Sequence, residues 1–244
     1  MGRLTEAIKH LIIINVIFFI ATQLYGDQLY LWFSLYFPEN ENFQLWQVVS
    51  HMFMHGGLMH IAFNMYGLWA FGSPLERAWG KNKFLFFYFS AGLGAAALHL
   101  ASNYYFFNDG LTALVEAGVS KNEVLDIISR GKYSPDWYNI TSQSSVDSMI
   151  AAFSTPAVGA SGAVYGVLVA FAFMYPNSEL MMIFLPIPIK AKYFVPLIIF
   201  GDLIFGVTNT GTGIAHFAHI GGALVGFIMM WYWKKNQFNK NRWN

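Results

Sequence analysis

Polar side chains that are capable of catalysis interrupt the apolar stretches of this sequence at three separate places. They are His60 and Asn64, then Ser161, and finally His216 and His219. A serine hydroxyl becomes a strong nucleophile when a base, most often histidine, takes its proton. Its attack on a carbonyl creates an oxyanion, which needs preorganised hydrogen-bond donors. These residue types predict acyl-transfer chemistry centred on Ser161.

The surroundings of Ser161 suit this chemistry. Ser161 starts a predicted helix, where free backbone N–H groups and the helix dipole favour negative charge. His60 and Asn64 lie four residues apart and share a helix face, so both can add side-chain donors. Tyr165 lies one turn below Ser161, where its ring can pack on a histidine.

The identity of the base is not decided by spacing, which leaves His216 and His219 as alternatives. The sequence supplies no obvious carboxylate behind either one, so we expect a Ser-His dyad in preference to a triad. Asp202 interrupts an apolar stretch and is expected to be a hydrogen-bonded partner within the helix bundle rather than a proton site. His51 and His55 are expected to be structural, with hydrogen bonds across the outer loop.

The composition indicates a membrane protein. The chain has 244 residues, of which 56% are apolar and 11% charged, whereas a soluble domain carries about 25% charged residues. A disordered chain is excluded because it needs low hydrophobicity and high net charge. The net charge of +1 argues against nucleic acid as a partner. Without cysteine, the chain has no disulfide, thiolate metal site or cysteine nucleophile.

Six apolar stretches approach the length of about 20 residues that a membrane-spanning helix needs. They are 11–26, 51–73, 84–104, 159–176, 193–207 and 214–233. No small-residue cleavage site precedes Gly26, so the first stretch is expected to be a retained anchor. The predicted fold is an all-α bundle of six transmembrane helices, forming a single domain over 1–244.

The distribution of basic residues predicts the orientation of this bundle. With six spans, eleven of the fourteen lysines and arginines fall on the side of the two termini, which the positive-inside rule assigns to the cytoplasm. Spans two, four and six then run inward and begin at the outer face. Their histidines and Ser161 fall in one outer layer, which is the strongest argument that they form one site.

Pairs of small residues indicate which spans pack closely. Gly162 and Gly166, and likewise Gly222 and Gly226, are spaced for small-xxx-small contacts between helices. Packing of spans four and six through these pairs would bring Ser161 within reach of a histidine.

Three segments are expected outside the membrane on the far side from the termini. Residues 27–50 mix aromatic and acidic stretches and predict an interfacial element. Residues 105–158 are interpreted as an extramembrane insert with one short helix over 111–130. Residues 208–213 are Thr, Asn and Gly and predict a flexible loop.

Three motifs, taken together, resemble those of the rhomboid family of intramembrane serine proteases. They are His51-Met-Phe-Met-His55-Gly-Gly-Leu-Met-His60-Ile-Ala-Phe-Asn64, then Gly159-Ala-Ser161-Gly162-Ala-Val-Tyr165-Gly166, and Ala218-His219-Ile-Gly221-Gly222. Glu76-Arg77-Ala-Trp-Gly80 is also similar to the family. The resemblance extends over all six predicted spans in the right order.

This resemblance implies a role for each site residue. Ser161 would be the nucleophile and His219 the general base, because the family's base directly precedes Ile-Gly-Gly. His60, Asn64 and the Ser161 amide would form the oxyanion hole, and Tyr165 would orient His219. The flanking small residues that support this site are Gly159 and Gly162.

The resemblance also implies the substrates and the location of the reaction. Substrates would be single-pass transmembrane proteins, cut near the outer face of a bacterial plasma membrane. The fifth span and the 208–213 loop would act as gate and cap in the lipid bilayer. Neither a metal nor an organic cofactor is expected.

Two departures and two rival functions accompany this interpretation. Relatives often carry Trp-Arg where this chain has Trp46-Gln47, and the 105–158 insert is longer than in a minimal member.

A histidine-box metalloenzyme is the rival enzyme, although its sites commonly need more ligands than these histidines supply. A proteolytically inactive helix-binding protein is the other rival, although such a protein should have lost the serine or the histidine.

Overall fold

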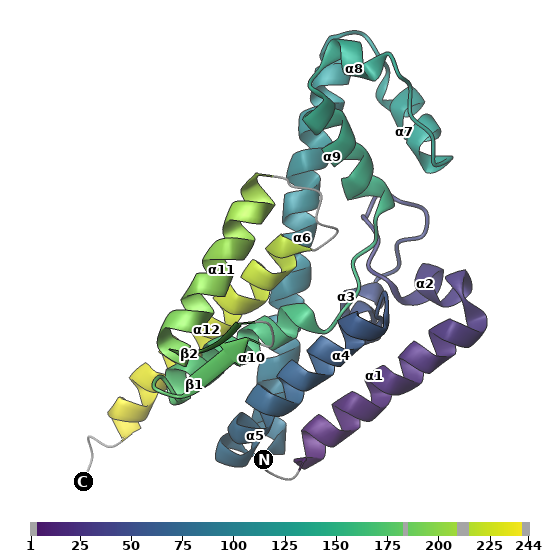
Figure 1. Cartoon of the computed structure of the whole chain (residues 1–244). Coiled ribbons are helices and arrows are strands. Elements are labelled where there is room, and N and C mark those ends of the chain that lie inside the picture. The colour runs from purple at the N-terminus through teal and green to yellow at the C-terminus, as the bar shows by residue number, and fades with distance from the viewer. Residues whose placement is uncertain (1–3, 183–184, 209–214, 241–244) are drawn as a thin grey trace.

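The computed structural model describes residues 4–182, 185–208 and 215–240, and most of these residues are helical (Figure 1). The first half of the chain contains α1 (Glu6–Tyr25), α2 (Asp27–Phe33), α3 (Gln47–Ser50), η1 (His51–Phe53), α4 (Leu58–Gly67), η2 (Leu68–Gly72), α5 (Ser73–Trp79) and α6 (Lys81–Glu116). The second half contains α7 (Lys121–Ser129), α8 (Trp137–Ile140), α9 (Gln143–Ser154), α10 (Ser161–Met174), β1 (Glu179–Met182), β2 (Leu185–Lys190), α11 (Ala191–Val207) and α12 (His216–Lys240). The predicted helical bundle is therefore confirmed, with one small hairpin added.

Helices occupy all six predicted stretches, but they differ in length. Among the described residues, two helices are long and apolar enough to cross a bilayer, namely α1 and α6. α10 has only 14 residues, and the second stretch is divided among η1, α4, η2 and α5. The start of α1 and the end of α12 lie at the same end of the bundle, opposite α7–α9 (Figure 1). Six crossings and cytoplasmic termini stay predictions.

The tightest packing joins α6, α10 and α12. A β-carbon added at Gly226 would lie 2.8 Å from the Cα atom of Gly166, and one at Gly166 would lie 2.9 Å from the carbonyl oxygen of Gly222. The two backbones approach this closely because no side chain separates them. The predicted packing through small residues is confirmed, and it brings the start of α10 beside the first turns of α12.

The second stretch breaks where two glycines follow each other. η1 ends at Phe53, and α4 begins only at Leu58. Gly57, which precedes α4, has an extended backbone with φ 173° and ψ 169°. Gly56 and Gly57 lie in this break, so His51 on η1 and His60 on α4 belong to separate helices, and His55 lies between the two.

The carboxylate of Glu76 connects α5 to the start of α1. It accepts hydrogen bonds from the backbone N–H groups of Ala7 at 2.7 Å and Ile8 at 3.0 Å, and from the Thr5 hydroxyl. The first N–H groups of a helix have no partner within the helix, and a carboxylate there also complements the dipole. The conspicuous Glu76–Gly80 motif thus has a structural role at the end of the bundle that holds the N-terminus.

The segment between α6 and α10 contains three helices where the sequence predicts one, so that prediction is wrong. α6 continues to Glu116, and α7 starts afresh after Ser120, whose hydroxyl accepts from the Glu123 N–H. Gly118, with φ 96°, makes the turn between them. The helices share a core of their own, which includes Phe107, Leu114, Val124, Trp137, Val146, Met149 and Phe153.

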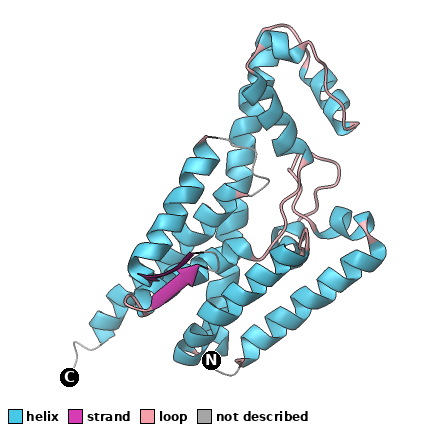
Figure 2. Ribbon diagram, viewed as in Figure 1, coloured by secondary structure: helices cyan, strands magenta, loops and turns pink. Residues whose placement is uncertain are grey.

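An antiparallel hairpin, which the sequence analysis did not predict, precedes α11 (Figure 2). Glu179 pairs with Lys190, which is also the N-cap of α11. The apolar side chains that α11 exposes include Leu197, Phe200, Leu203, Ile204 and Phe205. An apolar outer surface of this kind suits contact with lipid. The predicted loop at 208–213 lies outside the described residues, apart from Thr208.

Candidate active site

Ser161 is the first residue of α10, as predicted. Gly159, two residues earlier, has φ 124°, a backbone conformation that residues other than glycine rarely adopt. This turn leads the chain directly into the helix. The first N–H groups of α10 lack acceptors within the helix, and the dipole is positive at this end. Negative charge that develops beside Ser161 is therefore stabilised by the backbone.

His219 is the histidine that contacts the serine. Its Nε2 atom lies 2.8 Å from the Ser161 Oγ atom. The Tyr165 ring stacks on the imidazole with a centroid separation of 4.1 Å and an interplanar angle of 11°. The structure thus brings together three residues that the sequence analysis grouped, and it selects His219 over His216 as the partner of the serine. Their chemical roles stay predictions.

A carboxylate lies behind this histidine, contrary to expectation. The Asp202 Oδ1 atom, on α11, is 3.1 Å from the His219 Nδ1 atom and 2.5 Å from the His216 Nδ1 atom. Asp202 and both histidines are buried. The expectation of a hydrogen-bonded partner within the bundle is correct, whereas the expectation that no carboxylate lies behind either histidine is wrong. The available signal was a single acid in the apolar stretch 193–207.

His60 presents a hydrogen-bond donor on the side of the site where Gly159 and Ser161 lie. Its Nδ1 atom accepts from the Gly56 N–H at 3.3 Å, so in the neutral ring the proton lies on Nε2. A β-carbon at Gly159 would lie 2.8 Å from that Nε2 atom and 3.6 Å from the Ser161 Oγ atom. Asn64 is buried one turn further along α4, where its amide donates to the His60 carbonyl at 2.9 Å.

Comparison with known sequences identifies the family to which this site belongs. The sequence matches the family model for the Rhomboid domain over residues 42–121 and 138–236, which contain every site residue described above. The chain belongs to the rhomboid family. This rhomboid is therefore a membrane protein, as its composition predicts. The unmatched residues 122–137 lie within the insert, over most of α7 and the segment that follows it.

Two relatives show how far the similarity extends. RHOMBOID-like protein 12, mitochondrial, from Arabidopsis thaliana is 24% identical over 237 residues, which are 96% of this chain and 60% of that protein. Rhomboid protease GlpG from Serratia proteamaculans (strain 568) is 39% identical over 69 residues, which are 28% of this chain and 25% of that protein. The rhomboid described here thus spans less than two thirds of the length of either relative.

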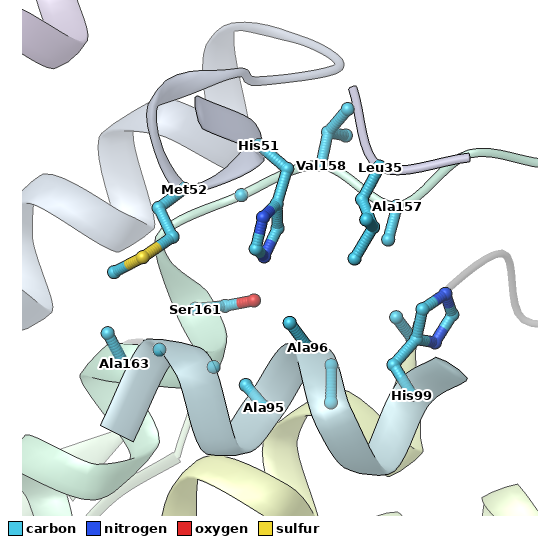
Figure 3. Close-up of a pocket in the computed structure, with 15 residues that line it drawn as sticks. Leu35, His51, Met52, Ala95, Ala96, His99, Ala157, Val158, Ser161 and Ala163 are labelled. Carbon is cyan, nitrogen blue, oxygen red and sulfur yellow. The ribbon is translucent and has the colours of Figure 1, made fainter. Parts of the chain in front are cut away.

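A small cavity lies beside the serine of this rhomboid (Figure 3). Its wall includes Ser161, whose hydroxyl points into it, together with His51, His99 and small residues of α6. The volume in which the centre of a water molecule can be placed is about 20 Å³. The cavity can therefore hold one water. The His51 Nδ1 atom is 2.8 Å from the Gln47 carbonyl oxygen, so its Nε2 atom is left as an acceptor.

His51 and His55 differ in their partners, because the His51 ring has a hydrogen-bond partner whereas neither ring nitrogen of His55 has one among the described residues. His51 bonds to the carbonyl four residues earlier, and the backbone carbonyl of His55 accepts from the Tyr30 phenol at 2.7 Å. The predicted connection across the outer segment is therefore made by the backbone of His55. The His55 ring instead meets the His60 ring edge-on, with centroids 5.0 Å apart.

Three side chains of the site also form a candidate metal-binding group. Asp202, His216 and His219 each offer a ligand atom, and these atoms lie within 4.8 Å of one another. Two imidazoles and a carboxylate form a set that Zn²⁺ accepts. A bound ion would take the same Nδ1 atoms that now face Asp202, so it would compete with the hydrogen bonds described above.

Gln47 has a role that the sequence analysis left open. The side chain is fully buried. Its Oε1 atom accepts from the N–H groups of Tyr36 at 3.3 Å and Gln44 at 3.2 Å, and its Nε2 atom donates to the carbonyls of Leu31 at 3.1 Å and Asn42 at 2.8 Å. This neutral amide therefore holds the outer segment 27–50 together. It does so at the position where relatives often carry the arginine of Trp-Arg.

Proposed function

We propose that this rhomboid is an intramembrane serine endopeptidase that cleaves single-pass transmembrane proteins. The observation that carries the proposal is the 2.8 Å contact between the Ser161 Oγ atom and the His219 Nε2 atom. Nε2 is the atom that must take the hydroxyl proton, and the contact is within hydrogen-bonding range for general-base catalysis.

Acylation begins when Ser161 attacks the scissile carbonyl. His219 takes the hydroxyl proton, Oγ bonds to the carbonyl carbon, and the carbonyl oxygen becomes an oxyanion. In this proposal the His60 Nε2–H and the Ser161 backbone N–H donate hydrogen bonds to that oxyanion and stabilise its charge. Asn64 becomes a further donor if its amide turns away from the His60 carbonyl. The protonated His219 then gives its proton to the leaving amine.

Deacylation requires a water molecule at the same serine. The cavity beside Ser161 has space for one water, and the acceptor nitrogen of His51 gives it a polar partner. His219 takes a proton from this water as its oxygen bonds to the acyl carbon. The protonated His219 then returns that proton to the Ser161 oxygen as the ester bond breaks and the new carboxyl terminus leaves. No metal or organic cofactor takes part in these steps.

The proposed substrate enters from lipid past α11. α11 exposes apolar side chains on its outer surface and contains Pro196, which interrupts its backbone hydrogen bonds. A transmembrane segment offers an extended carbonyl only where small or helix-breaking residues loosen its helix. We therefore propose cleavage near the outer face, with α11 as the gate.

We propose a bacterial plasma membrane as the location. With the six proposed spans, eleven of the fourteen basic residues fall on the side of the termini, which supports a cytoplasmic position for both ends. The Serratia relative is bacterial and is named a protease. The Arabidopsis relative is named mitochondrial and rhomboid-like, so a proteolytically inactive helix-binding protein is the second candidate.

The test is labelling by a serine-reactive fluorophosphonate, followed by cleavage of a fluorescent single-pass transmembrane peptide in proteoliposomes. Ser161→Ala and His219→Ala should abolish both signals, while Ser154→Ala, an exposed serine at the end of α9, should abolish neither. Peptide binding without labelling or cleavage by the folded wild type would favour the inactive helix-binding protein. Labelling that survives Ser161→Ala would overturn the proposal.

A further inference from the structure

We propose that Asp202 is a positioning residue that completes a Ser161–His219–Asp202 triad, with His216 as a second donor that holds the carboxylate in place. This inference rests on the proposed function and extends it to a third helix, because Ser161 is on α10, His219 on α12 and Asp202 on α11.

The hydrogen bonds determine which nitrogen of His219 carries the proton. An ionised carboxylate oxygen can only accept, and Asp202 Oδ1 lies 3.1 Å from His219 Nδ1. The proton of neutral His219 is therefore on Nδ1. The lone pair is left on Nε2, which faces the Ser161 hydroxyl at 2.8 Å. Asp202 thus selects the tautomer that can act as a base.

The carboxylate also stabilises the charge that forms during acylation. When His219 takes the serine proton at Nε2, the ring becomes an imidazolium that donates from both nitrogens. The buried Asp202 lies directly against its Nδ1–H. Asp202 keeps its charge throughout and takes no proton, so the proton moves only from Ser161 to His219 and then to the leaving amine.

Other groups keep Asp202 in position. His216 donates from Nδ1 to the same oxygen at 2.5 Å, and the Tyr165 ring stacks on His219, the other imidazole that faces this oxygen. A buried carboxylate is costly unless donors satisfy it. Both histidine donors come from α12, and together they hold the carboxylate of α11 against this helix.

Asp202→Asn removes the charge while keeping the shape. The new amide can donate to His219 Nδ1, which would move the ring proton to Nε2 and block the base. We expect kcat for the transmembrane peptide to fall by about a hundredfold to ten-thousandfold, with little change in KM. Asp202→Glu keeps the negative charge, so its kcat should be higher than that of Asp202→Asn but lower than that of wild type. His216→Leu should cause a smaller loss, because Asp202 keeps its contact with His219.

Two controls separate positioning from folding. Asp147→Asn alters an exposed aspartate of the insert and should leave kcat unchanged. In wild type labelled with ¹⁵N-histidine, the His219 Nδ1–H should give a far-downfield proton resonance, and this signal should disappear in folded Asp202→Asn. This measurement on wild type remains decisive if Asp202→Asn does not fold.

The outcomes distinguish this inference from the proposed function. If Ser161→Ala is inactive but folded Asp202→Asn keeps kcat within about threefold, the role of Asp202 is overturned and the protease stands. Absence of the downfield resonance in wild type overturns the role of Asp202 as well. If Ser161→Ala cleaves as fast as wild type, the proposed function itself fails.

Discussion

Gly159 and His60 are in such close contact that a β-carbon at position 159 would lie 2.8 Å from the His60 Nε2 atom. The glycine therefore leaves the space in which the proposed oxyanion donor points toward Ser161. Gly159→Ala should push His60 away and lower kcat by about a hundredfold to a thousandfold, the loss seen when one oxyanion donor is removed. Kinetics with the transmembrane peptide measure this loss.

Backbone strain alone is a different explanation for such a loss, since φ at Gly159 is 124°. Gly118→Ala is the matched control, because Gly118 has φ 96° and an added β-carbon there meets no atom within 4 Å. It should show strain without loss of kcat. Equal effects of the two substitutions on kcat would count against the His60 role.

The site residues that could be predicted from sequence are the polar residues that interrupt apolar spans. Ser161 and His219 meet because the glycine pairs bring α10 and α12 together, and those pairs have a recognisable spacing. Asp202 was recognised as unusual, but its partner was not, because nothing in the local sequence determines how α11 lies against α12. That placement depends on tertiary packing and on a hairpin that was not predicted.

The insert shows a different limit. Apolar residues recur with helical spacing through 111–130, so the pattern continues across a real break. The signals for that break, Gly118 and Ser120, are local and easily outweighed by the longer periodicity. The packing of α7–α9 against the end of α6 arises from contacts distant in sequence, such as that of Phe107 with Phe153, and no local pattern encodes them.

Replacement of Gln47 should destabilise the outer segment without directly changing the chemistry. Gln47→Met keeps the volume but leaves the N–H groups of Tyr36 and Gln44 and the carbonyls of Leu31, Trp32 and Asn42 without this partner. A buried group that loses its partner, such as the Tyr36 N–H, costs about 1–3 kcal/mol, so the midpoint of thermal unfolding in detergent should fall clearly. Gln143→Met, at an exposed position in α9, is the control and should change little. An unchanged midpoint for Gln47→Met would show that the amide is dispensable.

Zinc should inhibit the proposed peptidase activity of this protein. Asp202, His216 and His219 can bind Zn²⁺ through atoms that otherwise orient the base. We expect full cleavage activity in a strong chelator, loss of activity on addition of Zn²⁺, and recovery when the chelator is added again. His216→Leu should require more Zn²⁺ for half inhibition. Loss of activity in chelator alone would instead indicate a required metal and favour the metalloenzyme.

The membrane orientation can be tested on a chain that contains no cysteine of its own. Asn122→Cys lies in α7 of the insert and Lys235→Cys near the end of α12, and both positions are exposed. If the basic residues determine orientation, an impermeant maleimide applied to intact bacteria that express the protein should label Cys introduced at 122 from outside. The position at 235 should be labelled only after permeabilisation. The cysteine-free parent is the blank, and equal labelling of both positions in intact cells would contradict an extracytoplasmic insert with a cytoplasmic C-terminus.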